Sequence, residues 1–318
     1  MKKINRFPSL LLSLITVLLL LPVSVLAAGK IDLTQPVSLT LSYQDGGTPL
    51  TGADFSAYLV ATVDESGQLT TTKPFQSFRV DMTGKQDDTW RQLASTLEGY
   101  VLRDSVQPTA QGSTDGQGQL TLPTGGKKLT PGLYLILGSR HTQNGSYYDP
   151  SPFFVLLPTA DREANDYTYQ VTADVKYDKT PVPDQPTKVT RTMQKVWKDD
   201  GHEKARPQEV VVQLLRGGQV YDTVTLNSQN NWRHRWSDLD SRYRWTVTEK
   251  TVADYTVTVT QEGKTFVVTN TYQTPTPGKK TDTKLPQTGQ LWWPVPVLLS
   301  VGLLLVLIGV LRRRRDDT

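Results

Sequence analysis

The sequence predicts an all-β protein in which two β-sandwiches follow one another in tandem, with one helix inserted in the first. Short runs of alternating apolar and polar residues recur in both halves of the chain, for example at 37–43 and 255–259. Such alternation places one face of a strand in a core and the other in water. Turn signals rich in Gly and Asp separate these runs at intervals typical of β-sandwiches. A helical period occurs instead at 88–103.

Residues 1–28 are predicted to be a secretory signal peptide. Lys2, Lys3 and Arg6 precede a short apolar run at 10–21, and small residues follow that run. A basic segment, an apolar segment and a small-residue cleavage site in this order are typical of such leaders. The alternative is an uncleaved membrane anchor, which the short run does not favour. We therefore expect the remainder of the chain to be exported.

The first sandwich is expected over residues 29–179. Its helix, at 88–103, follows an aspartate pair at 87–88 that can cap the helix start. Apolar residues recur in the helix at spacings of three and four, which gives one apolar face for packing on a sheet. We expect the helix to cover one edge or face of this sandwich. The apolar face consists of Trp90, Leu93, Ala94, Leu97, Tyr100 and Val101.

Two stretches rich in Pro and Thr divide the rest of the chain. Residues 180–187 are predicted to link the first sandwich to the second, which is expected over 188–273. Residues 274–284 are predicted to act as a spacer after the second sandwich. Both assignments follow from composition, because Pro-rich segments favour extended conformations and cannot bury a core.

Three polar residues of the second sandwich lie where strand alternation calls for apolar ones. Lys195, Glu249 and Asn270 fall on three different predicted strands, each on the face that also carries apolar residues. If these faces share one core, all three side chains are buried. A buried lysine and a buried glutamate are costly unless they are paired or neutral. Their neighbours on these faces are Met193, Trp197, Trp245, Val247, Phe266, Val268 and Tyr272.

Burial makes a reaction among these three residues feasible. Desolvation lowers the pKa of lysine and raises that of glutamate, by up to ~3–5 pH units for full burial. An uncharged Lys195 amine is a nucleophile, and a protonated Glu249 can polarise the Asn270 carboxamide and transfer protons to departing ammonia. The predicted product is a Lys195–Asn270 isopeptide bond, formed once, with proximity supplying the rate. The alternative is a surface Lys195–Glu249 ion pair worth ~0–1 kcal/mol, with Asn270 in a turn.

Six segments of the second sandwich carry a family resemblance: Gln194–Asp199, Arg206–Pro207, Val210–Leu215, Asn231–Trp232, Tyr243–Glu249 and Val268–Tyr272. On these segments, residues 188–272 resemble the B-type repeat of collagen adhesin, the Cna B-type domain. The resemblance implies a reverse immunoglobulin-like β-sandwich. It also implies an internal isopeptide bond made by Lys195, Glu249 and Asn270, which occupy the motif positions of that family.

The first sandwich carries a second resemblance. Residues 120–123, 132–136 and 152–158 resemble the N-terminal domains of pilus subunits, and the helix resembles an insertion seen in some of them. This implies a second immunoglobulin-like sandwich. Its first predicted strand has no inward Lys, and its last, at 167–177, has no Asn. We therefore expect no isopeptide bond in the first sandwich.

Two lysines near the end of the first sandwich are candidate acceptors for another pilin subunit. Alternation along 167–177 turns Lys176 toward water, and Lys179 follows the strand. Pilins often carry a short Val-x-x-Pro-Lys-like motif in this place, and its lysine accepts the threonyl carbonyl of the next subunit. The Pro of that motif is missing here.

The C-terminal region contains three features in a fixed order. The peptide Leu285-Pro286-Gln287-Thr288-Gly289 precedes an apolar run at 291–311 and a basic tail at 312–318. The run has the length of about 20 residues that a membrane-spanning helix needs, with positive charge after it. This order resembles the cell-wall sorting signal of Gram-positive surface proteins, which implies that a sortase joins the Thr288 carbonyl to an amine of the peptidoglycan precursor. The alternative is an ordinary single-span anchor.

Composition excludes several classes of function. The absence of cysteine excludes disulfides, thiol catalysis and cysteine-ligated metal. The formal net charge of +4 arises from the two ends of the chain, so it gives no argument for nucleic-acid binding. No nucleophile elbow or phosphate-binding glycine loop occurs, and we expect no cofactor. His141, His202 and His234 lack metal-ligand spacing, so we expect no metal site.

Together these features predict a structural cell-surface protein, covalently anchored to peptidoglycan, and a minor (basal) pilus subunit. Its expected partners are a sortase, the peptidoglycan precursor and a major pilin, and the chain passes through the membrane before sorting. We do not expect an enzyme, since the isopeptide bond forms in a single turnover. The alternative is a solitary adhesin that binds host matrix or host cells. An adhesive surface would need a long insertion or an exposed aromatic patch, and neither is evident in the sequence.

Overall fold

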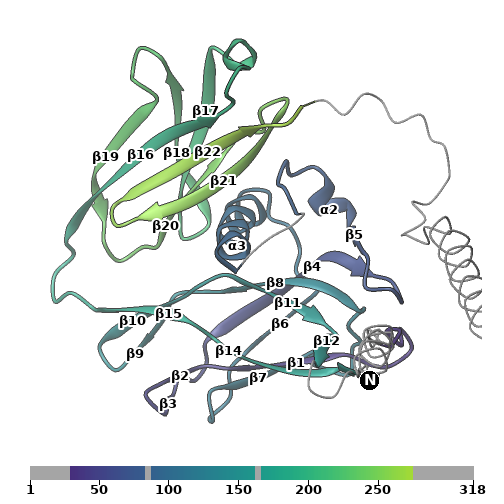
Figure 1. Cartoon of the computed structure of the whole chain (residues 1–318). Helices are drawn as coiled ribbons and strands as arrows, with labels where there is room; N and C mark the ends of the chain where they lie inside the picture. Colours follow the sequence, from purple (N-terminus) through teal and green to yellow (C-terminus); the bar gives the residue numbers. More distant parts are fainter. Residues whose placement is uncertain (1–28, 83–86, 162–165, 275–318) are drawn as a thin grey trace, which may run out of the picture. The chain divides into compact units, whose positions relative to one another are not determined.

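The computed structural model describes residues 29–82, 87–161 and 166–274, and these are mainly β-strand (Figure 1). They form two β-sandwiches that succeed one another along the chain, so the predicted fold class is confirmed. The signal peptide, the sorting peptide and the apolar run at 291–311 lie outside the described residues. Within the described ranges, no helix is long and apolar enough to cross a membrane.

The first sandwich encloses its core between a three-stranded and a five-stranded sheet. Leu39, Leu41 and Tyr43 point into this core, as their alternation predicts, together with Phe55 and Tyr134 of the opposite sheet. The smaller sheet has the order β14 (Gln170–Asp174), β1 (Ser38–Ser42) and β7 (Gln119–Leu122). The larger has the order β11 (Phe153–Leu157), β8 (Gly132–Gly138), β4 (Asp54–Val63) and β5 (Leu69–Thr71), with β6 (Ala110–Ser113) paired to β4.

The end of the first sandwich differs from the single strand expected at 167–177. The described chain there forms three strands, because its pairing partner changes twice: from β12 to β1 and then to β10. The last strand runs on to Pro181, so the first two residues of the expected linker are paired with β10. The strands involved are β12 (Thr159–Asp161), β13 (Asp166–Thr168), β10 (Ser146–Pro150), β15 (Tyr177–Pro181) and β9 (His141–Gln143). A separate hairpin is formed by β2 (Gln44–Asp45) and β3 (Thr48–Pro49).

The second sandwich has a four-stranded and a three-stranded sheet. Every position that alternation assigned to its core is buried or half-buried, from Met193 on the first strand to Tyr272 on the last. The four-stranded sheet has the order β19 (Arg233–Asp240), β16 (Lys188–Lys198), β22 (Thr265–Tyr272) and β21 (Tyr255–Glu262). The other has the order β18 (Gln219–Asn227), β17 (Glu209–Arg216) and β20 (Trp245–Glu249), and a short 3-10 turn, η1 (Glu203–Ala205), precedes β17.

Both sandwiches join a strand from the start of the domain to a strand from its end in parallel. In the first, β1 pairs with β14, and Leu41 lies opposite Ala173. In the second, β16 pairs with β22, and Lys195 lies opposite Val268. The remaining pairs that the structure describes are antiparallel, as connections by hairpins and longer loops allow.

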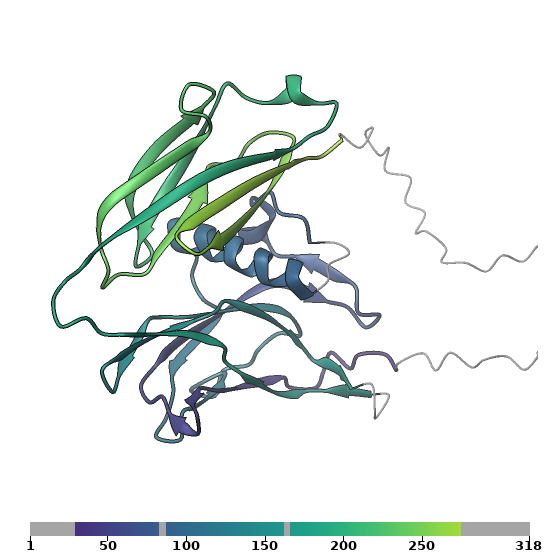
Figure 2. The ribbon, with the colours of Figure 1, turned by 60° about the vertical axis from the view of Figure 1, so that its left-hand side comes forward.

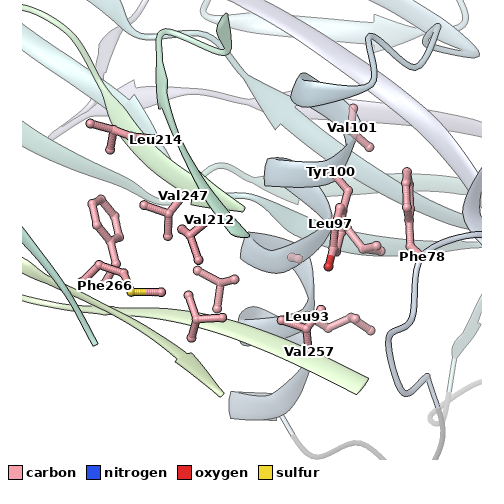
Figure 3. Packing of buried hydrophobic residues seen from close by; sticks show 14 of the residues in the cluster. Phe78, Leu93, Leu97, Tyr100, Val101, Val212, Leu214, Val247, Val257 and Phe266 are labelled. Atoms are coloured by element: carbon pink, nitrogen blue, oxygen red, sulfur yellow. The ribbon is translucent and has the colours of Figure 1, made fainter. Parts of the chain in front are cut away.

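The predicted helix is confirmed as α3 (Asp87–Arg103), and a short helix, α2 (Lys73–Gln76), precedes it. The apolar face of α3 packs with Phe78 and with the outer face of the first sandwich. Figure 3 shows Leu97 and Tyr100 directed toward Phe78, while Val212 of the second sandwich lies on the other side of the helix. Thus α3 covers one face of the first sandwich, as expected, and it also contacts the second, as the turned view in Figure 2 shows.

Candidate functional site

Lys195, Glu249 and Asn270 meet in the core of the second sandwich. Lys195 and Asn270 lie on the neighbouring parallel strands β16 and β22, with side chains on the same face, because Lys195 pairs with Val268 and Trp197 pairs with Asn270. Glu249 ends β20 in the opposite sheet. The two sheets therefore bring the lysine and asparagine on one side to face the glutamate on the other.

All three residues are buried, as the sequence predicts. Lys195 is 5% exposed, Glu249 1% and Asn270 0%. The alternative of a surface ion pair with Asn270 in a turn is therefore wrong, since the lysine and glutamate side chains are shielded from water and Asn270 lies within a strand. Met193, Val247 and Val268 supply the apolar surroundings.

The polar atoms of the three side chains lie within contact distance. The Asn270 amide Nδ2 donates a hydrogen bond to Glu249 Oε1 at 2.7 Å, and Lys195 Nζ lies 3.5 Å from Glu249 Oε2. Lys195 Nζ also donates to the Val268 and Val196 carbonyl oxygens at 3.3 and 3.4 Å. Since amide nitrogen and oxygen are assigned from such contacts, the 2.7 Å separation also fits a protonated Glu249 donating to the amide oxygen.

Burial moves both titratable groups toward their neutral forms. It lowers the pKa of Lys195 to about 8, against the opposing effect of the Glu249 carboxylate. It also raises the pKa of Glu249, which the Lys195 charge opposes. The site thus increases the share of Lys195 that carries a free electron pair and moves Glu249 toward its acid form, the combination that an attack on an amide requires.

A second cluster, with the buried Asp199 at its centre, supports the lysine end of the site. Trp197 places its ring 4.3 Å from Lys195 Nζ, and the Tyr255 ring packs against Trp197 at a centroid distance of 5.1 Å. The Tyr255 hydroxyl donates to Asp199 at 3.0 Å, and Arg206 donates two hydrogen bonds to the same carboxylate at 2.6 Å each. The Arg206 hydrogen bonds are the main cause that lowers the pKa of Asp199. This network fixes the ring that covers the amine.

Sequence reasoning missed the role of Asp199. The His202 amide donates to the Asp199 carbonyl oxygen in a turn, while the Asp199 side chain is buried. The alternation along the strand does indicate that the Asp199 side chain is buried. Met193, Lys195 and Trp197 point inward, and the same period of two continues to Asp199.

The two candidate acceptor lysines lie on the first sandwich, apart from this site. Lys176 is exposed, as its alternation predicts, in the short connection between β14 and β15. Lys179 lies on β15, where its amine contacts Asp45 Oδ2 at 2.6 Å and the Tyr148 ring at 5.4 Å. Among the described residues, the amine of Lys179 is thus held in an ion pair, whereas no such contact is found for that of Lys176.

The first sandwich has apolar residues where the second has its polar ones. Leu39 and Leu41 of β1 face Val171 and Ala173 of β14 in the parallel pair. The residues described by the structure also include no group of three or more His, Cys, Asp or Glu arranged to hold a metal ion. The sorting residues Leu285 to Gly289 lie outside the described residues.

The second sandwich matches a known family. Residues 191–271 match the family model of the Cna protein B-type domain. The chain is 36% identical over 96 residues to collagen adhesin from Staphylococcus aureus, an alignment that covers 28% of this chain and 8% of that protein. The match therefore concerns one domain and a small part of the relative's length.

The solved structures that the chain matches, all at low TM-scores, include surface proteins and pilins. A single B repeat unit of the collagen-binding surface protein of Staphylococcus aureus gives a TM-score of 0.27 at 17% identity, covering 76% of this chain and 99% of that one. The major pilin SpaD of Corynebacterium diphtheriae gives 0.28 at 14%, covering 76% and 65%. The basal pilin SpaE of Lactobacillus rhamnosus GG gives 0.30 at 9%, covering 72% and 84%. Such low scores and identities leave function to be argued from the site.

Proposed function

We propose that this chain is a structural cell-surface protein whose second sandwich is closed by an autocatalytic isopeptide bond between Lys195 and Asn270. The observation that carries the proposal is the buried Lys195–Glu249–Asn270 triad, with Glu249 within 2.7 Å of the amide and 3.5 Å of the amine. We further propose that a sortase anchors the protein to peptidoglycan through Thr288, and that it serves as a basal pilus subunit.

The triad accounts for each step of bond formation. The uncharged Lys195 Nζ attacks Cγ of Asn270, while protonated Glu249 hydrogen-bonds the amide oxygen and stabilises the charge that develops there. Glu249 then gives its proton to the departing nitrogen and takes one from the attacking amine in its place. The Cγ–Nδ2 bond breaks, the Nζ–Cγ bond remains, and one ammonia molecule is released. Glu249 ends the reaction protonated, as it began, and the chain reacts only once.

The anchoring proposal has two independent supports. The sorting peptide at 285–289 precedes an apolar run and four arginines in the order that a sorting signal requires. The relative that matches the second sandwich is named a collagen adhesin, which supports a cell-surface location. A covalently closed β-sandwich suits a protein that bears mechanical load between a wall and a partner.

Replacing Thr288 tests the anchor. In a Thr288→Ala chain expressed with its native sortases, we expect the protein in the membrane fraction and the medium instead of the peptidoglycan fraction. The reason is that the sortase lacks the threonine whose carbonyl it transfers to the peptidoglycan precursor. Thr281→Ala, in the preceding spacer, is the matched control and should leave wall-bound protein unchanged. Normal wall-bound yield from Thr288→Ala would refute anchoring through this residue.

Replacing the acceptor lysines tests the pilus assignment. Lys176 is favoured because its side chain is exposed, whereas Lys179 would have to leave Asp45 before reacting. With native sortases and the major pilin present, the wild type should give a high-mass ladder on denaturing gels. We expect Lys176→Ala to abolish the ladder, Lys179→Ala to preserve it and both to keep wall anchoring. An unchanged ladder in the double variant would exclude both lysines.

One observation favours the second candidate, a solitary adhesin. The structure shows the exposed aromatic patch that the sequence did not reveal: Val220, Tyr221 and Tyr243 are three of the four large hydrophobic residues that are exposed in the described chain. The Arg216 guanidinium lies between the two tyrosines, 5.2 and 4.9 Å from their ring centroids. If the wild type forms no ladder with the major pilin present, this patch becomes the leading candidate for host contact.

A further inference from the structure

A second face of α3, distinct from its apolar stripe, is buried against the second sandwich. Thr96, Gly99 and Arg103 are spaced by three and four residues and so share one side of the helix. Thr96 is almost fully buried although it is polar, and Gly99 is buried as well. A polar helix face is normally left in water, so its burial here indicates a specific contact.

On one side, this face completes the edge strand β21. The Val259 amide donates to Thr96 Oγ1 at 2.8 Å, and the Val257 amide donates to the Arg79 carbonyl oxygen at 3.0 Å. Both amides belong to the last strand of the four-stranded sheet and have no strand neighbour on that side. The insertion of the first sandwich therefore supplies acceptors that a buried sheet edge requires.

On the other side, the same face lies directly on β20, the strand that ends in Glu249. A Cβ at Gly99 would lie 2.9 Å from the Val247 carbonyl oxygen and 3.2 Å from Thr248 Cβ, so only glycine allows this approach. Arg103 Nη1 donates to the Glu249 carbonyl oxygen at 3.3 Å. Just before the strand, Arg244 forms a two-point ion pair with Glu98.

These contacts hold the backbone of the residue that catalyses bond formation. Glu249 must keep its carboxyl against both the Asn270 amide and the Lys195 amine, which come from the opposite sheet. β20 is the end strand of its sheet and has a strand partner, β17, on one side alone. Without α3, its other edge would be free to shift.

We infer that α3 of the first sandwich positions β20, and with it Glu249, so that isopeptide bond formation in the second sandwich depends on docking of the first. The inference rests on the proposed Lys195–Asn270 bond. Gly99, Thr96 and Arg103 are positioning residues, since they do not touch the reacting atoms. The first sandwich thereby promotes bond formation in the second, and the bond forms after α3 has docked on β20.

Two variants of the mature chain test this dependence. Gly99→Ala favours the helix intrinsically but forces it away from β20. Thr96→Val keeps the shape of the side chain and removes the acceptor for Val259. After a pulse of cell-free synthesis, intact mass followed over time gives the rate of ammonia loss. We expect both variants to react about 10-fold more slowly or worse, because a misplacement of about 1 Å can cost on the order of 10²-fold.

Three matched controls separate positioning from general destabilisation. Gly116→Ala adds a Cβ where no atom lies within 4 Å, and Ser95→Ala removes a hydroxyl from the adjacent helix position. Both should react at the wild-type rate. Thr96→Ser retains the acceptor and should restore the rate, which a role in stability alone would not predict. Circular dichroism of every variant reports whether it is folded.

The outcomes distinguish this inference from the proposed function. A wild-type chain that never loses ammonia overturns the isopeptide bond and this inference with it. A wild-type chain that forms the bond, with Gly99→Ala and Thr96→Val forming it at the same rate, overturns the role of α3 alone. Slow reaction in both variants, with rescue by Thr96→Ser, supports it.

Discussion

The two sandwiches share a parallel pairing of an early and a late strand but fill the space beneath it differently. In the first, Leu41 lies opposite Ala173 and the core around them is apolar. In the second, the corresponding pair of strands presents Lys195 and Asn270 to Glu249. Since the first sandwich forms without such residues, the fold does not require them. Burying an ion pair is often no more stabilising than burying apolar groups of the same size. The triad is therefore better explained by the bond it can form.

The largest expected effect comes from removing the lysine. Lys195→Met keeps an unbranched side chain of similar length but cannot form the bond, so a long loop is no longer closed in the unfolded chain. By analogy with a disulfide closing such a loop, the free energy of unfolding should fall on the order of 4 kcal/mol. Urea denaturation followed by tryptophan fluorescence measures the change, because Trp197, Trp236 and Trp245 lie in the second sandwich.

The first sandwich provides the control for this prediction. Leu41→Met makes a comparable replacement at a buried position of β1 and should cost less than about 1.5 kcal/mol, with no change in the mass lost. If Lys195→Met is no more destabilising than Leu41→Met, the two cores do not differ in the way the triad implies.

A smaller effect concerns acid stability of the first sandwich. Hydrogen bonds from Lys179, Tyr148 and Tyr177 lower the pKa of Asp45 from 3.8 to about 2. A depressed carboxyl pKa contributes stability that is present above the unfolded value of 3.8 and is lost as the pH falls toward 2. Asp45→Asn should thus be less stable than wild type near neutral pH, and the difference should shrink as the pH falls through about 2. A difference that persists undiminished at that pH would show that the carboxylate charge is not its cause.

Alternation alone located the triad, because its residues lie on strands with a regular period of two. The same period, continued past Trp197, also places Asp199 in the core, where its side chain is buried. Strand pairing was harder to predict: the shift of the chain from β1 to β10 depends on which partner lies beside it, and no residue between 167 and 177 marks that change.

The second face of α3 could not be predicted from its residues. Its apolar stripe followed from periodicity, which detects one face of a helix. Thr96 and Glu98 are polar, and polarity normally indicates contact with water. Their burial depends on the Val259 amide of β21, which donates to Thr96, and on Arg244, which pairs with Glu98; both lie more than 100 residues away in the chain. The role of Gly99 could not be predicted either, because it comes from the close approach of β20.

The most direct test of the account is the mass of the purified extracellular chain, followed by tandem mass spectrometry of its peptides. We predict a mass lower than the sequence by one ammonia molecule, a linked peptide pair that joins Lys195 to Asn270, and recovery of the full mass in Glu249→Ala. The linked pair distinguishes the bond from loss of ammonia at some other asparagine. An unmodified mass in the wild-type chain, or a loss of ammonia without that linked pair, would contradict the account.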